Sequence, residues 1–182
     1  MDMEHIVAAD AITINGFAGR EGIVPFADMA VAGGKGVFVW TRASNPSAGV
    51  LQDFADANGK KFWELLAEQV ATIACEPKYM GQSGYSSIGM VIGGTTAQQT
   101  QGLREQYPHI IFLVPGYGAQ GAGPDDCRKF CKADGTGAIV PASRSVIYAF
   151  NEPKYKDTYG SNNWEKCIEQ AALDMAKELA VK

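Results

Sequence analysis

The sequence contains little of what builds a metal centre or a disulfide framework. Its 182 residues include two histidines, His5 and His109, and four cysteines that are spread along the chain. Cys127 and Cys131 lie one helical turn apart, but no second pair of ligands stands at the spacing of a zinc site. In a chain with ample core material, sparse cysteines indicate reduced thiols. We therefore expect neither a metal site nor disulfide bonds.

Long apolar runs and a positive charge excess are also missing. Runs such as residues 36–40 and 110–114 are far shorter than the roughly 18 residues that a membrane helix needs. The amino terminus, MDMEHIVAAD, is acidic where a secretory signal would be basic, which predicts a cytoplasmic protein. The net charge of -4 provides no polybasic arm. We expect neither a nucleic-acid partner nor membrane association.

Apolar runs of strand length alternate with longer amphipathic stretches, which is the pattern of repeated β-α units around a parallel sheet. This predicts an α/β fold in one domain, residues 1–182. The predicted strands are residues 11–15, 36–42, 88–93, 110–115 and 137–141. The predicted helices are residues 23–32, 48–57, 61–75, 97–106, 125–132 and 164–181, with an apolar turn at 145–150.

The five predicted units fit either an open doubly wound sheet or most of a TIM (β/α)8 barrel. A complete barrel has eight units and takes about 250 residues, so this chain would be about three units short. The first predicted strand has no element before it to cover one side. We therefore expect that a further segment supplies the first strands of a barrel.

The strongest local signal is the segment PGYGAQGAGPDD, residues 115–126, directly after a predicted buried strand. Its glycine loop, residues 116–123, exposes backbone N–H groups and lets an anion approach closely. The next predicted strand ends in VPASRS, where Arg144 can bind a phosphate through two N–H groups. The loops after the last two strands of a TIM barrel commonly bind phosphate. These two neighbouring loops therefore predict a phosphate site.

The same glycine loop also has the spacing of a dinucleotide-binding motif. Gly116, Gly118 and Gly121 spell GxGxxG after a strand. In the dinucleotide fold this motif opens a helix, but here the sequence Ala-Gly-Pro, ending at Pro124, follows and resists helix formation. No acidic residue ends the next strand to bind a ribose, although Arg144 could meet a 2′-phosphate. NAD(P) binding is therefore the weaker interpretation.

A second polar loop, the SNP loop, has the sequence TRASNPSAG at residues 41–49 and also follows a predicted strand. Ser44 and Asn45 could hydrogen-bond a polar heterocycle, and Pro46 fixes the turn. Alternatively, Ser44, Asn45 or Ser47 caps the next helix. The loop alone does not decide between a binding role and a capping role.

Five segments carry a resemblance to a known family. They are ADAITIN at 9–15, GVFVWTRASNPSAG at 36–49, VIGGTT at 91–96, FLVPGYGAQG at 112–121 and PASRSVIYA at 141–149. In this order they resemble orotidine 5′-phosphate decarboxylase, and they look most like its longer bacterial branch. The resemblance covers nearly the whole chain, and PGxGAQG followed by SR is not a generic barrel pattern. It corresponds to strands four to eight, the carboxyl-terminal part of the barrel.

The resemblance implies a function and a set of binding residues. The family converts orotidine 5′-phosphate to UMP and CO2 in pyrimidine biosynthesis, as a homodimer and without metal or cofactor. Ser44 would contact the pyrimidine edge, and Pro115 would line the pocket beside the reacting carbon. Gln120 would bridge phosphate and base as its loop closes. Arg144 and the backbone at Ser143 would hold the 5′-phosphate.

The sequence departs from the family at the reaction centre. The family carries its catalytic lysine and aspartate in a DxKxxD motif on the third strand, and the partner subunit adds an aspartate. No DxKxxD occurs in the 182 residues, so the resemblance assigns no catalytic residue to this chain. We expect that the missing strands carry the catalytic lysine and aspartate. Alone, the chain would be inactive and poorly folded because of its open barrel edge.

Two other functions remain open at this point. The chain could be a non-catalytic nucleotide-phosphate-binding fragment or paralogue. It could also be another phosphate-handling barrel enzyme, such as a sugar-phosphate decarboxylase of the same superfamily, although the SNP loop argues against that. The sequence does not assign a role to Tyr117 within the glycine loop.

Overall fold

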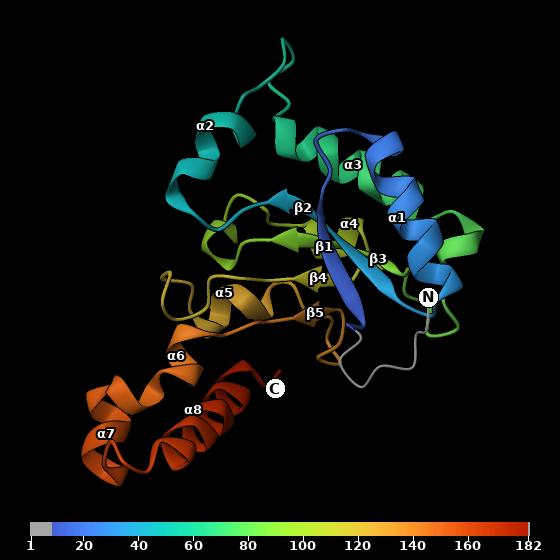
Figure 1. Cartoon of the computed structure of the whole chain (residues 1–182). Helices are drawn as coiled ribbons and strands as arrows, with labels where there is room; N and C mark the ends of the chain where they lie inside the picture. Colours follow the sequence, from blue (N-terminus) through green and yellow to red (C-terminus); the bar gives the residue numbers. More distant parts are fainter. Residues whose placement is uncertain (1–8, 182) are drawn as a thin grey trace.

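The computed structural model describes residues 9–181, in which five parallel strands pair in chain order (Figure 1). The strands are β1 (Ala11–Asn15), β2 (Gly36–Arg42), β3 (Ile88–Ile92), β4 (Phe112–Leu113) and β5 (Ala138–Ile139). A doubly wound sheet would reverse its strand order at a switch point, whereas a TIM barrel adds each strand beside the last. The order β1-β2-β3-β4-β5 therefore confirms the α/β prediction and identifies a portion of a barrel.

Helices follow each strand and lie around the sheet (Figure 1). The α-helices are α1 (Arg20–Ala32), α2 (Gly49–Gln52), α3 (Phe62–Ala74), α4 (Leu103–Gln106), α5 (Pro124–Arg128), α6 (Arg144–Ile147), α7 (Pro153–Tyr159) and α8 (Trp164–Leu179). The short 3-10 helices are η1 (Pro46–Ala48), η2 (Pro77–Tyr79), η3 (Gly94–Thr96) and η4 (Ala149–Asn151). Within the described part of the chain, no helix combines the length and apolar character needed to cross a membrane.

The sheet register separates a covered face from an uncovered face. On the covered face, Val39, Met90 and Phe112 pair across β2, β3 and β4 and are fully buried. They pack in one core with residues of α1 and α3. Burial of such side chains stabilises a fold by roughly 1.5–3 kcal/mol each, so this layer supplies most of the packing.

The opposite face carries a row of apolar side chains whose two ends are exposed, whereas Val91 within the row is 5% exposed. Successive residues of a strand point to opposite faces, so the register places Trp40, Val91, Leu113 and Ile139 in one row on this side. Trp40 is 49% exposed and Ile139 is 50% exposed. In a closed barrel this face is the packed interior.

Both edges of the sheet are open. Within the described residues, β1 pairs only with β2, and β5 pairs only with β4. A closed barrel has no such edges, because every strand has two neighbours. The open edges are consistent with the expectation that further strands complete the barrel between β5 and β1.

The strand predictions are mostly accurate, but β4 and β5 are shorter than expected. The predicted strands at 11–15 and 36–42 match β1 and β2 at both ends, and β3 ends one residue early. β4 and β5 each have two paired residues, although the flanking backbone continues the pairing at single points, such as the Val114 N–H donating to the Ile139 carbonyl at 2.8 Å. The apolar run at 110–114 therefore predicted the position of the strand more accurately than the length of the strand.

The prediction of a helix at 97–106 is wrong for most of its length, because α4 begins only at Leu103. The Thr96 hydroxyl donates to the Gly93 carbonyl at 2.7 Å, and the Thr100 hydroxyl donates to the Thr96 carbonyl at 3.0 Å. Gly102 then adopts a φ of 86°, outside the helical region. These local bonds and the left-handed glycine favour a chain of turns over a regular helix.

Other predictions outside the strands also need correction. The helix expected at 23–32 begins earlier, at Arg20, and the helix expected at 125–132 ends at Arg128. The helix expected at 48–57 stops at Gln52, where the segment turns toward α3. The apolar turn expected at 145–150 is instead α6 followed by η4, and α7 was not predicted at all. The apolar residues of this region do not line a strand. Ala149 of η4 packs with Cys167 and Ala171 of α8 in a second small core.

The four cysteines are free thiols, as expected. Cys127 is fully buried, and burial raises its pKa to about 11. Cys167 is also fully buried, whereas Cys75 is exposed. Since a thiolate is the reactive species, Cys127 remains a protonated and unreactive thiol near neutral pH while the chain is folded.

We therefore predict selective alkylation of the folded chain. Iodoacetamide at pH 8 should modify Cys75 and leave Cys127 and Cys167 unmodified until denaturant is added, as measured by peptide mass spectrometry. Modification of Cys127 at the rate of Cys75 in the native chain would contradict the packing of α5 against the sheet.

Candidate functional site

Four of the five predicted binding residues line one cavity. Pro115 and Gln120 come from the segment after β4, and Ser143 and Arg144 come from the segment after β5. The cavity has a volume of about 170 Å³ and is lined by no acidic residue. It lies where neighbouring parallel strands end, because the carboxyl ends of parallel strands meet at one edge of the sheet. The structure thus brings the two loops of the predicted phosphate site together.

The glycine loop is a closed loop and does not open a helix. Gly116, Gly118 and Gly121 have φ values of 112°, 66° and 96°, a region that other residues rarely adopt. The Gly118 N–H donates to the Ala122 carbonyl at 3.0 Å, and the Ala122 N–H donates to the Gly116 carbonyl at 3.1 Å. The next helix, α5, begins only at Pro124. This geometry argues against the dinucleotide interpretation, in which the motif runs directly into a helix.

The tip of the glycine loop presents unused backbone donors. Within residues 9–181, the N–H groups of Ala119 and Gln120 donate to no protein acceptor, and both residues are exposed. The backbone N–H of Ser143, on the facing segment, is also without an acceptor there. Backbone donors gathered around one cavity form a concave site for an anion.

Arg144 supplies the positive charge of this cavity. It is the first residue of α6, its side chain is exposed, and it forms no ion pair with any carboxylate of the described residues. Nearby, the Ser145 hydroxyl oxygen is buried without a hydrogen-bond partner in the described part. Glu152 lines a neighbouring cavity with Arg144, but the two form no ion pair. A guanidinium without a carboxylate partner, beside free N–H groups, is suited to a phosphate group.

Tyr117 connects the glycine loop to the last helix. Its hydroxyl donates to the Glu178 carboxylate of α8 at 2.6 Å. Burial, together with the neighbouring Glu178 carboxylate, raises the pKa of Tyr117, so its hydroxyl stays protonated and remains a donor. This tether assigns Tyr117 a role in holding the loop, which the sequence did not indicate.

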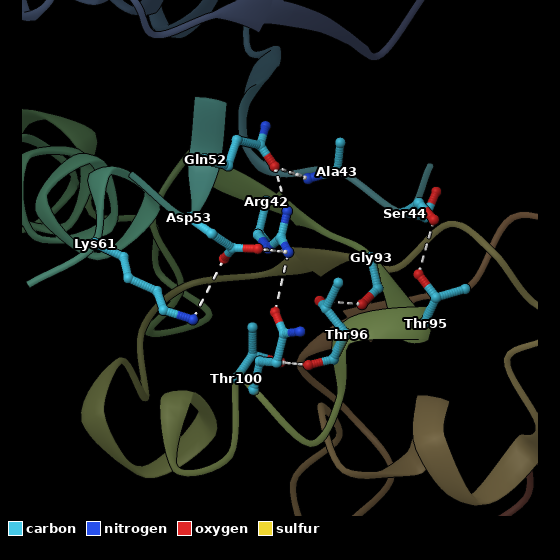
Figure 2. Close-up of polar contacts among 11 residues, drawn as sticks. Arg42, Ala43, Ser44, Gln52, Asp53, Lys61, Gly93, Thr95, Thr96 and Thr100 are labelled. Carbon is cyan, nitrogen blue, oxygen red and sulfur yellow. Dashed lines mark hydrogen bonds and ion pairs between the residues drawn. The ribbon is translucent and has the colours of Figure 1, made fainter. Parts of the chain in front are cut away.

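Ser44 does not line the phosphate cavity but lies directly behind it. A side-chain carbon added to Gly116 would come within 3.3 Å of the Ser44 Cβ. The Thr95 hydroxyl donates to the Ser44 carbonyl at 2.9 Å, as Figure 2 shows. The Ser44 hydroxyl itself has no protein partner among the described residues, and Ser44 is half-buried. Ser44 therefore stands next to the Pro115–Gly116 turn with its hydroxyl free.

The capping alternative for the SNP loop finds no support in the structure. Asn45 precedes the short helix η1, but its side chain makes no capping bond and instead donates to the Ser47 hydroxyl at 3.0 Å. Ala48 precedes α2 and has no side chain able to cap. The polar groups of this loop are therefore not used for helix capping.

A second cavity, of about 280 Å³, lies on the other side of the SNP loop. It is lined by Asn15 and Phe17 after β1, by Trp40 of β2, by Asn45 of the SNP loop and by Phe62 of α3, among others. The SNP loop therefore lines this second cavity and not the one that contains Arg144.

Sequence reasoning missed Arg42, the last residue of β2. Its side chain is buried and forms an ion pair with Asp53 at 3.1 Å (Figure 2). The sequence did contain one indication of its importance, a charged residue between an apolar strand and a polar loop. Its partners lie ten or more residues away, so the sequence did not show whether the charge points to solvent or inward.

Comparison with known proteins identifies the family. The model of the orotidine 5′-phosphate decarboxylase / HUMPS family matches residues 3–155. This chain belongs to that family. The family assignment agrees with the resemblance drawn from the five sequence segments.

Two curated relatives show how much of the family's length the chain covers. Orotidine 5′-phosphate decarboxylase of Rhodopirellula baltica is 34% identical over 171 residues, which are 94% of this chain and 56% of the relative. The enzyme of Clostridium novyi is 35% identical over 170 residues, which are 93% of this chain and 57% of the relative. The chain thus spans little more than half the length of these relatives.

Solved structures agree with the fold. Leishmania donovani UMP synthase superposes with a TM-score of 0.63 at 25% identity, covering 92% of this chain and 33% of that chain. Leishmania donovani OMP decarboxylase superposes with a TM-score of 0.62 at 24% identity, covering 92% of this chain and 58% of that chain. These likenesses support the assignment of the five strands to part of a TIM barrel.

The Tyr117 tether generates a testable prediction. Tyr117→Phe removes the hydrogen bond to Glu178 and keeps the ring, so it should loosen the glycine loop without unfolding the chain. A hydrogen bond to a charged group is worth about 1.5–3 kcal/mol, and local opening should become about tenfold or more faster. Hydrogen–deuterium exchange of residues 116–122 measures this.

A control separates the tether from a general loss of stability. Tyr159→Phe removes a hydroxyl that donates to Gln170 at 3.3 Å, away from the loop, and should leave exchange at 116–122 unchanged. Equal exchange in the wild type and Tyr117→Phe would show that Glu178 does not hold the loop.

Proposed function

We propose that this chain forms the phosphate- and pyrimidine-binding part of an orotidine 5′-phosphate decarboxylase, which converts orotidine 5′-phosphate to UMP and CO2. The observation that carries the proposal is the convergence of Pro115, Gln120, Ser143 and Arg144 on one cavity without acidic residues. Ser44 lies against the back of the same turn. Family membership supports this reading of the cavity.

Each residue has a distinct part in the proposed binding mode. Arg144 and the Ser143 N–H hold the 5′-phosphate, and the free N–H groups of the glycine loop tip add further donors. Ser44 contacts the pyrimidine edge through its free hydroxyl. Pro115 lines the space near the reacting carbon. Gln120 bridges the phosphate and the base when the glycine loop closes.

Phosphate binding contributes to the rate although it takes no part in the bond breaking. Binding energy from a remote part of the substrate can drive loop closure and so stabilise the transition state. In this chain the glycine loop is the segment that can close, because Ala119 and Gln120 are exposed at its tip and Tyr117 anchors its base. The chain therefore supplies binding and closure.

The chemical step requires residues from outside this chain. We propose that the remaining strands of the barrel carry the catalytic lysine and aspartate, which stabilise and protonate the carbanion left by CO2 loss. Those strands would cover the exposed side chains of Trp40 and Ile139 and pair with the two open edges. They reach the site either on a second polypeptide or as a further segment of the same protein.

The proposal includes an assembly and a location. A homodimer would place the partner's aspartate near the site, as in the family. The proposed location is the cytoplasm, and the four free thiols support it. The proposed ligand is a small nucleotide, and no cofactor is needed.

A non-catalytic phosphate-binding function is the second candidate. The absence of DxKxxD from the 182 residues favours it over an active enzyme for the chain alone. A third candidate, a sugar-phosphate decarboxylase, predicts equal or tighter binding of ribulose 5-phosphate than of UMP. Comparing these two ligands distinguishes the second and third candidates.

The phosphate assignment predicts the effect of Arg144→Ala on UMP binding. Loss of charge-assisted hydrogen bonds worth about 1.5–3 kcal/mol should raise the Kd about 10- to 150-fold in calorimetric titration. The matched control is Arg20→Ala, because Arg20 pairs with Glu76 at 2.6 Å and lies outside the cavity. Unchanged UMP affinity in Arg144→Ala would rule out the assignment.

Binding by this chain and chemistry by the remaining strands together predict that decarboxylation requires both parts of the barrel. The purified 19.4 kDa chain alone should not decarboxylate orotidine 5′-phosphate. Adding a polypeptide that carries the family's first three strands should restore turnover, measured by loss of substrate absorbance. Intact-mass analysis of the active sample should find both chains. Turnover by the single chain would refute this division.

A further inference from the structure

Arg42 brings together three segments of the chain at the edge of the sheet. Its Nη1 donates to Gln52 at 2.8 Å, and its Nη2 donates to Gln99 at 2.9 Å and to Asp53 at 3.1 Å. Gln52 and Asp53 end α2, whereas Gln99 lies beyond β3. Arg42 is only 4% exposed, so it does not contact a ligand in either cavity. Figure 2 shows its guanidinium beside Gln52 and Asp53.

Gln52 closes the SNP loop onto the end of β2. Its side-chain oxygen accepts the Arg42 Nη1 and also the backbone N–H of Ala43 at 3.0 Å. One acceptor therefore holds both the side chain of residue 42 and the backbone of residue 43. Residues 44–51, which include most of the SNP loop, lie between Ala43 and Gln52. The two ends of this segment are therefore joined through the Gln52 oxygen.

Ser44, the next residue along, is held from the β3 side. The Gly93 N–H donates to the Arg42 carbonyl at 2.7 Å, and the Thr95 hydroxyl donates to the Ser44 carbonyl (Figure 2). A side chain at Gly93 would come within 2.6 Å of the Ser44 Cα, so the backbones touch directly. The backbone of Ser44 is thus fixed on both sides while its hydroxyl remains free.

A register irregularity explains why a charged side chain is buried here. Between Trp40 and Arg42 the β2–β3 pairing shifts, and Thr41 and Arg42 are both buried. Such a bulge redirects a side chain out of the regular alternation. The guanidinium is thereby turned away from the ligand side and toward α2 and the segment after β3.

We propose that Arg42 is a positioning residue for the pyrimidine-contacting hydroxyl of Ser44. This inference rests on the proposed function, because it concerns the same site. Arg42 sets the shape of the SNP loop through Gln52 and links the loop to the segment after β3 through Gln99. It thereby determines affinity for the base and not for the phosphate, which Arg144 holds on a different loop.

The test compares two ligands in Arg42→Met. Methionine keeps much of the side-chain length. The Asp53 carboxylate loses its hydrogen bond from Arg42, but the Lys61 ammonium remains 3.4 Å away as a cation beside it. UMP affinity of the chain, with any polypeptide that co-purifies, should fall about tenfold or more. Affinity for ribose 5-phosphate, which lacks the base, should stay within about twofold. An equal loss for both ligands, or no loss for UMP, would overturn the proposal.

A second variant and a control distinguish a selective loss of UMP affinity from unfolding of the Arg42→Met chain. Gln52→Met removes the shared acceptor without removing a charge and should give the same selective loss of UMP affinity. Arg20→Met removes an exposed arginine outside the site and should change neither affinity. A selective loss in Arg42→Met without one in Gln52→Met would contradict the route through Gln52.

A ligand-free measurement separates this proposal from the proposed function. In Arg42→Met, hydrogen–deuterium exchange of residues 43–52 should become about tenfold faster, while exchange of residues 116–122 stays unchanged. If wild-type chain does not bind UMP, the proposed function fails, yet faster exchange would still show that Arg42 shapes the loop. Unchanged exchange at 43–52 would refute the positioning role whatever the ligand data.

Discussion

Parallel pairing in chain order is the constraint on which the rest of this structure depends. Because β1 to β5 run the same way and each lies beside its predecessor, all five carboxyl ends meet at one edge. Loops that are distant in sequence, such as the SNP loop and the segment before Arg144, are brought to that edge. The same pairing gives the sheet one face covered by helices and another that exposes Trp40 and Ile139.

The sequence was sufficient for those features that depend on local pattern. The β1 and β2 boundaries followed from apolar runs. The convergence of the glycine loop and Arg144 on one cavity followed from their places after neighbouring strands. Features that depend on distant partners were missed. The inward direction of Arg42 requires Gln99, 57 residues away, and the Tyr117 tether requires Glu178, 61 residues away. Likewise, threonine-to-carbonyl bonds overrode the helical pattern at 97–102.

The site separates binding from positioning in a physically simple way. Arg144 is exposed and has no carboxylate partner in the described residues, so its charge is available to a ligand. Arg42 is buried and already has its partners, so its charge organises the protein. Two arginines at the same sheet edge thus differ in burial and pairing, and this difference is the basis of the two roles that we propose for them.

The most direct test of the account is a crystal structure of the chain, with any co-purifying polypeptide, bound to UMP. The account predicts that the phosphate lies between the glycine loop and α6, within hydrogen-bond distance of the Arg144 guanidinium and the Ser143 N–H. It also predicts that the Ser44 hydroxyl faces the pyrimidine. A phosphate bound elsewhere, with Arg144 free in solvent, would contradict it.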